Sequence, residues 1–118
     1  PTDKLWHKLS LSPDETKVTY MLDEGSHMGS YEDCAIYIAD FNKETLTISN
    51  QKAISVLNTS YIDEYPRWNE DSTIVAYDSN RSGTFQIYAY RLSDGVTKRI
   101  SPDAEQNYRF MNFEGVPK

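Results

Sequence analysis

The sequence is poor in the residues that build cross-links, metal sites and membrane spans. Among its 118 residues there is one cysteine, Cys34, so no internal disulfide can form and the redox compartment stays open. The two histidines, His7 and His27, stand far apart in the chain, which favours surface histidines over a metal site. No apolar run approaches the roughly 20 residues that a membrane helix needs. We therefore expect no metal, no cofactor and no membrane insertion.

Motifs of nucleophilic and phosphate chemistry are missing as well. The sequence has no Gly-x-Ser-x-Gly, no Gly-rich phosphate loop, no Cys-x-x-Cys and no His-x-x-x-His. Ser, His and Asp residues occur, but no pattern places them together. We therefore expect no catalytic residues and favour a binding module over an enzyme.

Acidic side chains outnumber basic ones. The 18 Asp and Glu residues against 12 Lys and Arg residues give a net charge of −6. A surface of this sign repels phosphate backbones, so we expect no nucleic-acid partner.

Short β-type runs alternate with turn clusters along the chain. The runs 74–77 and 87–92 are almost continuously apolar, which is typical of strands covered on both faces. The spacing predicts an all-β fold with strands near 8–12, 17–24, 34–41, 45–49, 65–69, 73–79, 85–92 and 96–101. The expected buried residues are Val18, Tyr20, Ile36, Ile38, Trp68, Ile74, Ala76, Ile87 and Ala89. On this pattern alone, an antiparallel meander within a β-sandwich stays open as an alternative.

The chain also repeats itself, which narrows the choice. Residues 12–20 match residues 69–77 without a gap, 57 positions later. Residues 35–39 match residues 86–90 at an offset of 51, so the first copy carries six extra residues between its second and third strands. Two long, equivalent units indicate a repeat architecture.

A third copy begins near residue 107. The Asn-Tyr-Arg-Phe of residues 107–110 matches the Tyr-Pro-Arg-Trp of residues 65–68 at an offset of 42. That period lies in the range of a four-stranded propeller blade, about 40–45 residues. Leu11, Trp68 and Phe110 then share one position of the innermost strand. The predicted units are a first blade (1–64), a second blade (65–106) and the inner strand of a third blade or a closure segment (107–118).

These repeats resemble those of TolB-like propellers, relatives of the WD-type propellers. The similarity lies in the Ser-Pro-Asp-x-x-Lys-Val-x-Tyr of residues 12–20, and in Asn-Arg-Ser-Gly at 80–83 followed by Gln-Ile-Tyr at 86–88. Residues 69–72 depart from the family pattern, with Asn-Glu-Asp-Ser in place of Ser-Pro-Asp-Gly. The resemblance implies two four-stranded antiparallel blades and the first strand of a third, in an incomplete ring. It also implies a periplasmic or cell-envelope location in bacteria.

Two blades leave two apolar faces bare, because propellers close with typically four to eight blades. The sequence also starts at Pro1 and not at Met. We therefore expect a longer parent chain, or copies of this chain that associate. The expected partner is accordingly another protein, or a second copy bound through the open blade faces.

The long connections 25–33 and 51–64 are expected to share one face, because loops after the second strand and loops between blades project from the same end. Acidic residues and tyrosines gather in these loops, and binding residues often lie on loops held by a rigid scaffold. The tentative binding residues are Tyr31, Glu32, Asp33, Tyr61, Asp63, Glu64 and Arg81. Ordinary solvated loops are the alternative.

The functional prediction is a non-catalytic protein-interaction module similar to TolB-like propellers. The alternative is the accessory propeller of an enzyme, such as an oligopeptidase-type hydrolase or a polysaccharide lyase. A hydrolase domain with a nucleophile elbow elsewhere in the parent chain would distinguish the two.

Overall fold

The computed structural model describes residues 5–23, 34–55, 62–102 and 107–108 of the chain. In these ranges the backbone forms eight strands and no helix. The strands are β1 (Leu5–Leu11), β2 (Lys17–Asp23), β3 (Cys34–Asn42), β4 (Thr47–Ala53), β5 (Asp63–Trp68), β6 (Ile74–Ser79), β7 (Gln86–Arg91) and β8 (Thr97–Arg99).

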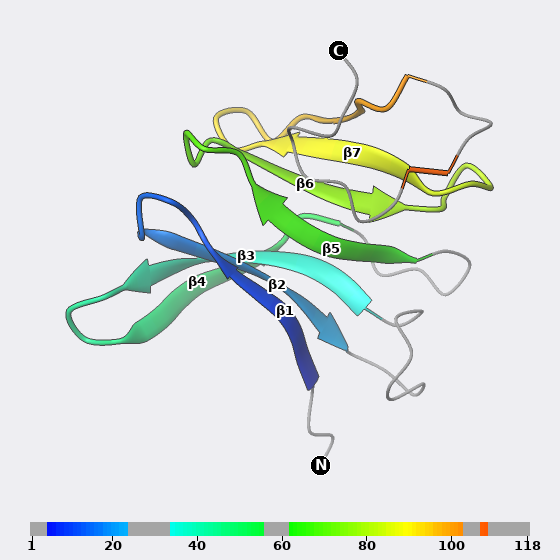
Figure 1. The fold of residues 1–118 in the computed structure, drawn as a ribbon. Helices are drawn as coiled ribbons and strands as arrows, with labels where there is room; N and C mark the ends of the chain where they lie inside the picture. Colours follow the sequence, from blue (N-terminus) through cyan, green and yellow to red (C-terminus); the bar gives the residue numbers. More distant parts are fainter. Residues whose placement is uncertain (1–4, 24–33, 56–61, 103–106, 109–118) are drawn as a thin grey trace.

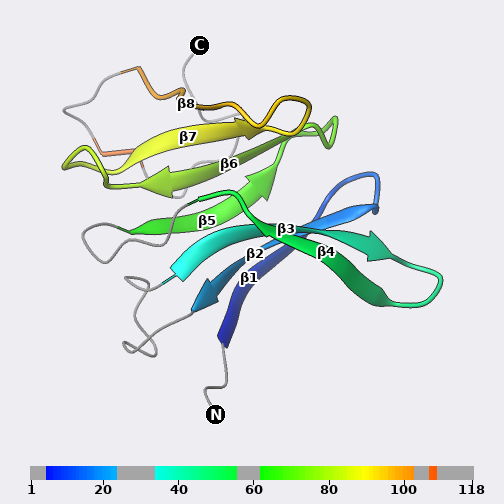
Figure 2. The ribbon, with the colours of Figure 1, turned by 180° about the vertical axis from the view of Figure 1, so that it is seen from behind.

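The strands form two antiparallel meanders. The first sheet has the order β1-β2-β3-β4 and the second the order β5-β6-β7-β8 (Figure 1). Figure 2 shows from behind how β4 forms the edge of the first sheet. The predicted all-β class and the predicted strands are confirmed, with bounds that differ by up to four residues. The largest difference is at β4, which ends at Ala53 instead of residue 49.

The repeat found in the sequence also appears in the strand pairing of the two sheets. Leu11 pairs with Val18 in the first sheet, and Trp68 pairs with Val75 at the equivalent place in the second. The turn after each first strand is fastened in the same way. The Ser12 hydroxyl accepts the Lys17 N–H at 3.0 Å, and Asn69 Oδ1 accepts the Ile74 N–H at 3.0 Å.

The first strand of each sheet, β1 and β5, has a shift in its pairing at the same point. The pairing shifts between His7 and Ser10 in β1, and between Glu64 and Arg67 in β5. Lys8 and Tyr65 lie within these shifts, and both have φ of 57°. A β-bulge of this kind bends and twists a strand, so the two first strands curve alike.

A serine after the last strand of each meander holds the third strand. The Ser55 hydroxyl accepts the Ile36 N–H at 2.9 Å, and the Ser101 hydroxyl accepts the Ile87 N–H at 3.1 Å. Both serines are buried. The recurring Ile-Ser pair of residues 54–55 and 100–101 is therefore part of the repeat, although the sequence comparison did not single it out.

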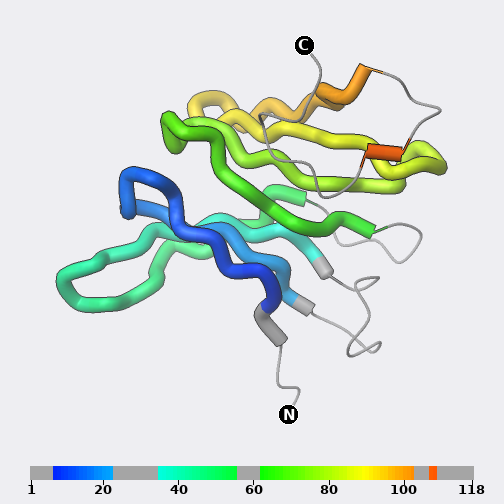
Figure 3. The backbone as a smooth tube through the Cα atoms, in the orientation of Figure 1, coloured from blue at the N-terminus to red at the C-terminus, as the bar shows by residue number. Residues whose placement is uncertain are grey.

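The two sheets meet through β5, which packs against β1, β2 and β3. The buried side chains at this junction are Met21 and Ile36 from the first sheet and Tyr77 from the second, with Ile54 and Tyr88 packed beside them. The smooth trace in Figure 3 shows β5 lying over the first sheet. Burial of this apolar cluster is the main force that holds the sheets together.

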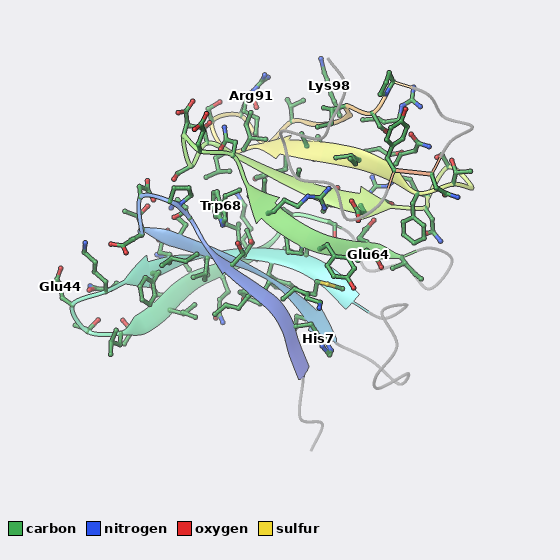
Figure 4. All side chains as sticks on the ribbon, viewed as in Figure 1. His7, Glu44, Glu64, Trp68, Arg91 and Lys98 are labelled. Carbon is green, nitrogen blue, oxygen red and sulfur yellow. The ribbon has the colours of Figure 1, made fainter. Side chains whose placement is uncertain are left out.

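Two hydrogen bonds near the turns also connect the two sheets. The Trp68 indole Nε1–H donates to the Ser10 carbonyl at 3.0 Å, and the Asp14 N–H donates to the Ser72 hydroxyl at 3.0 Å. Figure 4 shows Trp68 between the sheets. These contacts fix the relative position of the sheets, which apolar burial alone does not specify.

The predicted burial is right for six of the nine side chains, namely Val18, Tyr20, Ile36, Ile38, Ala76 and Ile87. It is wrong for Trp68, Ile74 and Ala89, which are half-buried. Ile74 and Ala89 line a depression on the face of the second sheet that points away from the first. An apolar run shows that a strand has two apolar faces, but not whether both are covered.

Among the residues that the structure describes, no helix is long and apolar enough to cross a membrane.

Candidate binding face

The strand ends that carry the long connections lie at one end of the two sheets, here called the loop end. Asp23 at the end of β2 pairs with Cys34 at the start of β3, and Ser79 at the end of β6 pairs with both Asp63 and Gln86. Figure 1 shows these strand ends on the same side. The short turns lie at the opposite end, here called the turn end. Of the predicted binding residues, Tyr31, Glu32, Asp33 and Tyr61 lie outside the described residues.

Asp63 and Glu64 do not lie in the long connection 51–64, so their expected place in an exposed loop is corrected. They are the first two residues of β5, and their exposed fractions are 2% and 0%. A buried carboxylate needs a compensating partner. A sequence pattern of loop-like acidic residues does not reveal where such a partner lies.

The partner of Asp63 is Arg81, in the β6–β7 connection. Arg81 Nη2 donates to Asp63 Oδ1 at 3.1 Å and to the Tyr77 hydroxyl at 3.1 Å, while Nε donates to the Ser79 hydroxyl at 2.9 Å. The guanidinium carbon also lies 4.4 Å from the centre of the Tyr88 ring. Arg81 thus ties the start of β5 to the β6–β7 connection.

The tyrosines beneath Arg81 belong to the junction between the sheets. The rings of Tyr77 and Tyr88 stack with centroids 6.2 Å apart. Burial raises the pKa of the Tyr77 hydroxyl above its usual 10, so this phenol stays neutral at physiological pH. Tyr20 and Tyr37 form the corresponding stacked pair in the first sheet, with centroids 5.6 Å apart.

A second ion pair lies on the other face of the second sheet. Arg67 Nη2 lies 2.8 Å from Asp78 Oδ1, and Arg67 Nη1 donates to the Tyr65 carbonyl at 2.7 Å. Asp78 is fully buried and Glu64 is its cross-strand neighbour. The charges at this end are therefore largely internal to the described part of the fold.

Within the described residues, the β6–β7 connection is an exposed part of the loop end. Asn80 holds it against the start of the blade, because Asn80 Oδ1 accepts the Ile62 N–H at 2.6 Å and the Asn80 N–H donates to the Ile62 carbonyl at 3.2 Å. The Gly83 N–H closes a turn onto the Asn80 carbonyl at 2.9 Å, with φ of 106° at Gly83. Arg81, Ser82 and Gly83 are exposed. The connection is thus a fixed, solvent-facing turn.

Among the residues that the structure describes, no group of three or more His, Cys, Asp or Glu side chains could hold a metal ion. Among the described polar groups of the loop end, Arg81 binds Asp63 and Ser79, and Asn80 binds the Ile62 backbone.

No family model and no curated protein matches this sequence. Solved structures do match. A puromycin hydrolase aligns with a TM-score of 0.68 over 84% of this chain at 12% identity, and a puromycin-hydrolyzing peptidase of Mycobacterium tuberculosis with 0.67 over 84% at 14% identity. A putative TolB of Agrobacterium tumefaciens aligns with 0.59 over 87% at 21% identity. The matched regions are propeller domains. The fold is that of β-propeller blades.

Each sheet is therefore one four-stranded blade, and β1 and β5 are the first strands of successive blades. The chain covers only 14% of the puromycin hydrolase and 32% of the TolB protein. At these identities the likeness concerns the fold, and the functions of those proteins are not thereby those of this chain.

Proposed function

We propose that the chain is a non-catalytic protein-interaction module, a blade pair of a larger propeller whose loop end binds a partner protein. The observation that supports this most is the way Arg81 and Asn80 fasten the exposed β6–β7 turn to β5. A fixed turn loses little conformational entropy on binding, and rigidly supported loops are where binding residues concentrate. The likeness to TolB, and with it a periplasmic or cell-envelope location, is consistent with this role.

The partner in this proposal is cationic, or rich in amide and hydroxyl groups. Asp63 and Glu64 do not contribute to the outer charge, because they are buried. The sequence has further acidic residues in the segments that follow β2 and β8, namely Glu24, Glu32, Asp33, Asp103 and Glu105. Together these carboxylates would attract a basic partner, in a manner that weakens as salt is added. One exposed charge contributes only about 0–1 kcal/mol, so the cluster as a whole must act.

The experiment replaces Glu32, Asp33 and Asp103 together by Ser. Binding of a hexalysine peptide is measured by fluorescence anisotropy at low and at moderate salt. We expect the substitutions to weaken binding several-fold at low salt and to flatten its salt dependence. Circular dichroism checks that the β-structure is kept.

The matched control replaces three exposed acidic residues of the turn end, Glu44, Glu70 and Asp71, by Ser. The net charge changes by the same amount, so a diffuse charge effect weakens binding equally in both variants. Equal weakening, or no hexalysine binding by the unaltered chain, would place the interaction elsewhere.

A second candidate function is that of an accessory propeller in a peptidase. It is favoured by the alignment with two puromycin-hydrolysing proteins. Sequencing the gene that encodes the chain decides this. A hydrolase domain with a nucleophile elbow in the same reading frame would support the peptidase, and its absence from the full reading frame would reject it.

A further inference from the structure

The contact between the two blades includes a cation above an aromatic ring. Lys52 of β4 reaches across to the second blade, and its Nζ lies 6.0 Å from the centre of the Tyr90 ring on β7. Ile54, two residues later, packs beside Tyr77 and Tyr88 of the second blade. The outer strand of the first blade therefore receives aromatic side chains of the blade that follows.

The second blade carries the same groups at the same places. Lys52 pairs with Ile38 on the third strand of the first blade, and Lys98 pairs with Ala89 on the third strand of the second. Ile54 and Ile100 are likewise equivalent, since their N–H groups donate to the carbonyls of Ile36 and Ile87, both at 2.8 Å. Lys98 and Ile100 of the second blade are thus the equivalents of Lys52 and Ile54 of the first.

Around Lys98 and Ile100 lies an open apolar depression of about 170 Å³. Its lining residues are Ile74, Ala89, Arg91, Val96, Lys98 and Ile100, all from the second blade. Val96 is 36% exposed and Ile74 is half-buried. In Figure 4, Arg91 and Lys98 lie at the side of the molecule away from the first blade.

We propose that this depression is the docking surface for a further blade, one with an aromatic ring on its third strand that covers Lys98. The proposal rests on the blade-pair function and adds the chemistry of the neighbour. The neighbour must supply a ring at the position of Tyr90 for the cation, and aromatic rings at the positions of Tyr77 and Tyr88 for Ile100. A cation over an aromatic face is attracted by the ring quadrupole.

A second copy of this chain is a poor occupant. At the positions of Trp68 and Tyr90 its first blade has Leu11 and Ala39, which offer neither an indole N–H nor an aromatic ring. Of its stacked pair that corresponds to Tyr77 and Tyr88, Tyr20 is fully buried already and Tyr37 is only half-exposed. The face of the second blade is therefore built for a different blade.

The sequence itself begins a third copy of the repeat. Phe110 stands at the Trp68 position of the repeat, at the offset of 42. The chain returns to the second blade just before it, where the Tyr108 N–H donates to the Phe85 carbonyl at 2.7 Å and Asn107 Oδ1 accepts the Phe85 N–H at 2.7 Å. The docking blade is thus expected to follow in the same chain.

The test supplies such a blade. Residues 107–118 are replaced by a copy of residues 65–102, which carries Trp68 and Tyr90, and the urea midpoint is compared with that of the unaltered chain. We expect the midpoint to rise. Lys98→Met in the first copy should then lower the midpoint of the extended chain and leave that of the unaltered chain unchanged. Lys52→Met, at the existing blade contact, should lower both midpoints by a similar shift.

Two controls sharpen the outcome. A chain extended instead by a copy of residues 8–55, which has Leu11 and Ala39, should gain less. Tyr90→Leu in the added blade should make the midpoint insensitive to Lys98→Met. An unchanged or lowered midpoint with the first extension, or an equal gain with the second, overturns the proposal. These readouts do not involve the loop end, so they leave the hexalysine test of the proposed function independent.

Discussion

At the scale of single residues, Asp14 shows how one carboxylate organises a turn. The Ser12 hydroxyl, the Thr16 hydroxyl and the Thr16 N–H donate to Asp14 Oδ1 at 2.7, 2.7 and 3.1 Å. These donors, led by Ser12, hold the pKa of Asp14 below its usual 3.8. The Lys17 ammonium lowers the pKa of Asp40 and the Arg91 guanidinium that of Asp94. Three surface carboxylates are therefore stabilised in their ionised form.

This arrangement predicts a loss of stability in acid. Because each of these pKa values is lower in the folded chain, the unfolded chain takes up protons first as the pH falls. The stabilisation is fully present above about pH 4 and is lost as the pH falls through the lowered values. Asp14→Asn, which keeps an acceptor oxygen but no charge, should reduce the drop in urea midpoint between pH 6 and pH 3. A drop as large as that of the unaltered chain would show that Asp14 does not contribute.

A second prediction at this scale concerns Arg81. Arg81→Met removes the partner of Asp63 and leaves a carboxylate buried, so we expect a loss of about 2–3 kcal/mol. This is less than for a fully buried pair, because 29% of the Arg81 side chain is exposed. Urea unfolding of Arg81→Met, Asp63→Asn and the double variant gives the coupling free energy between the two side chains. Costs that simply add would contradict a direct Arg81–Asp63 interaction.

At the scale of elements, the turns between the first two strands adopt an unusual backbone. Glu15 has φ of 62° and Ser72, at the equivalent position, has φ of 60°. Side chains other than glycine are strained in this left-handed region. The TolB-like pattern has Gly at this position, so Ser72, part of the departure noted in the sequence, and its equivalent Glu15 are both sites of strain.

Relief of this strain is measurable at Glu15, which is exposed. Glu15→Gly should raise the free energy of unfolding by about 0.5 kcal/mol, since the relieved strain exceeds the entropy cost of glycine. Glu15→Val should lower it by about 1 kcal/mol or more, because branched residues fit this region worst. Glu44→Gly, at an exposed turn position that does not have a positive φ, serves as the control and should be destabilising. Glycine that destabilises both positions alike would contradict the assigned backbone.

At the scale of elements, the sequence predicted the strand register but not the bulges or the long-range ion pair. The offset of 57 correctly placed Leu11 and Trp68 at equivalent positions of the two sheets. Similar turn residues and the same apolar spacing impose the same strand register. The bulges at Lys8 and Tyr65 were missed, since the two sites share no residue type. The burial of Asp63 depends on Arg81, which lies 18 residues later in the chain. Such long-range pairs are set by tertiary structure and leave no local pattern.

At the scale of the whole molecule, the two blades have the same strand order but carry different side chains on their faces. The junction uses Trp68, Tyr77 and Tyr88, and its direction is set by the Trp68 indole and the Ser72 hydroxyl. The sequence predicted the blades and the strand order. It did not predict which faces are covered, because an apolar strand looks the same whether or not a neighbour packs on it. The same limit explains why Ile74 and Ala89 were expected in the core.

The central claim is that the chain folds as two propeller blades joined through β5. The most direct measurement is nuclear Overhauser spectroscopy of the labelled chain in solution, with the Trp68 indole proton as the reporter. The structure predicts cross-peaks from that proton to Ser10, cross-peaks between Tyr65 and Met21, and antiparallel cross-peaks between β5 and β6. Cross-peaks within each sheet but none between Trp68 and β1 would contradict the joined pair of blades.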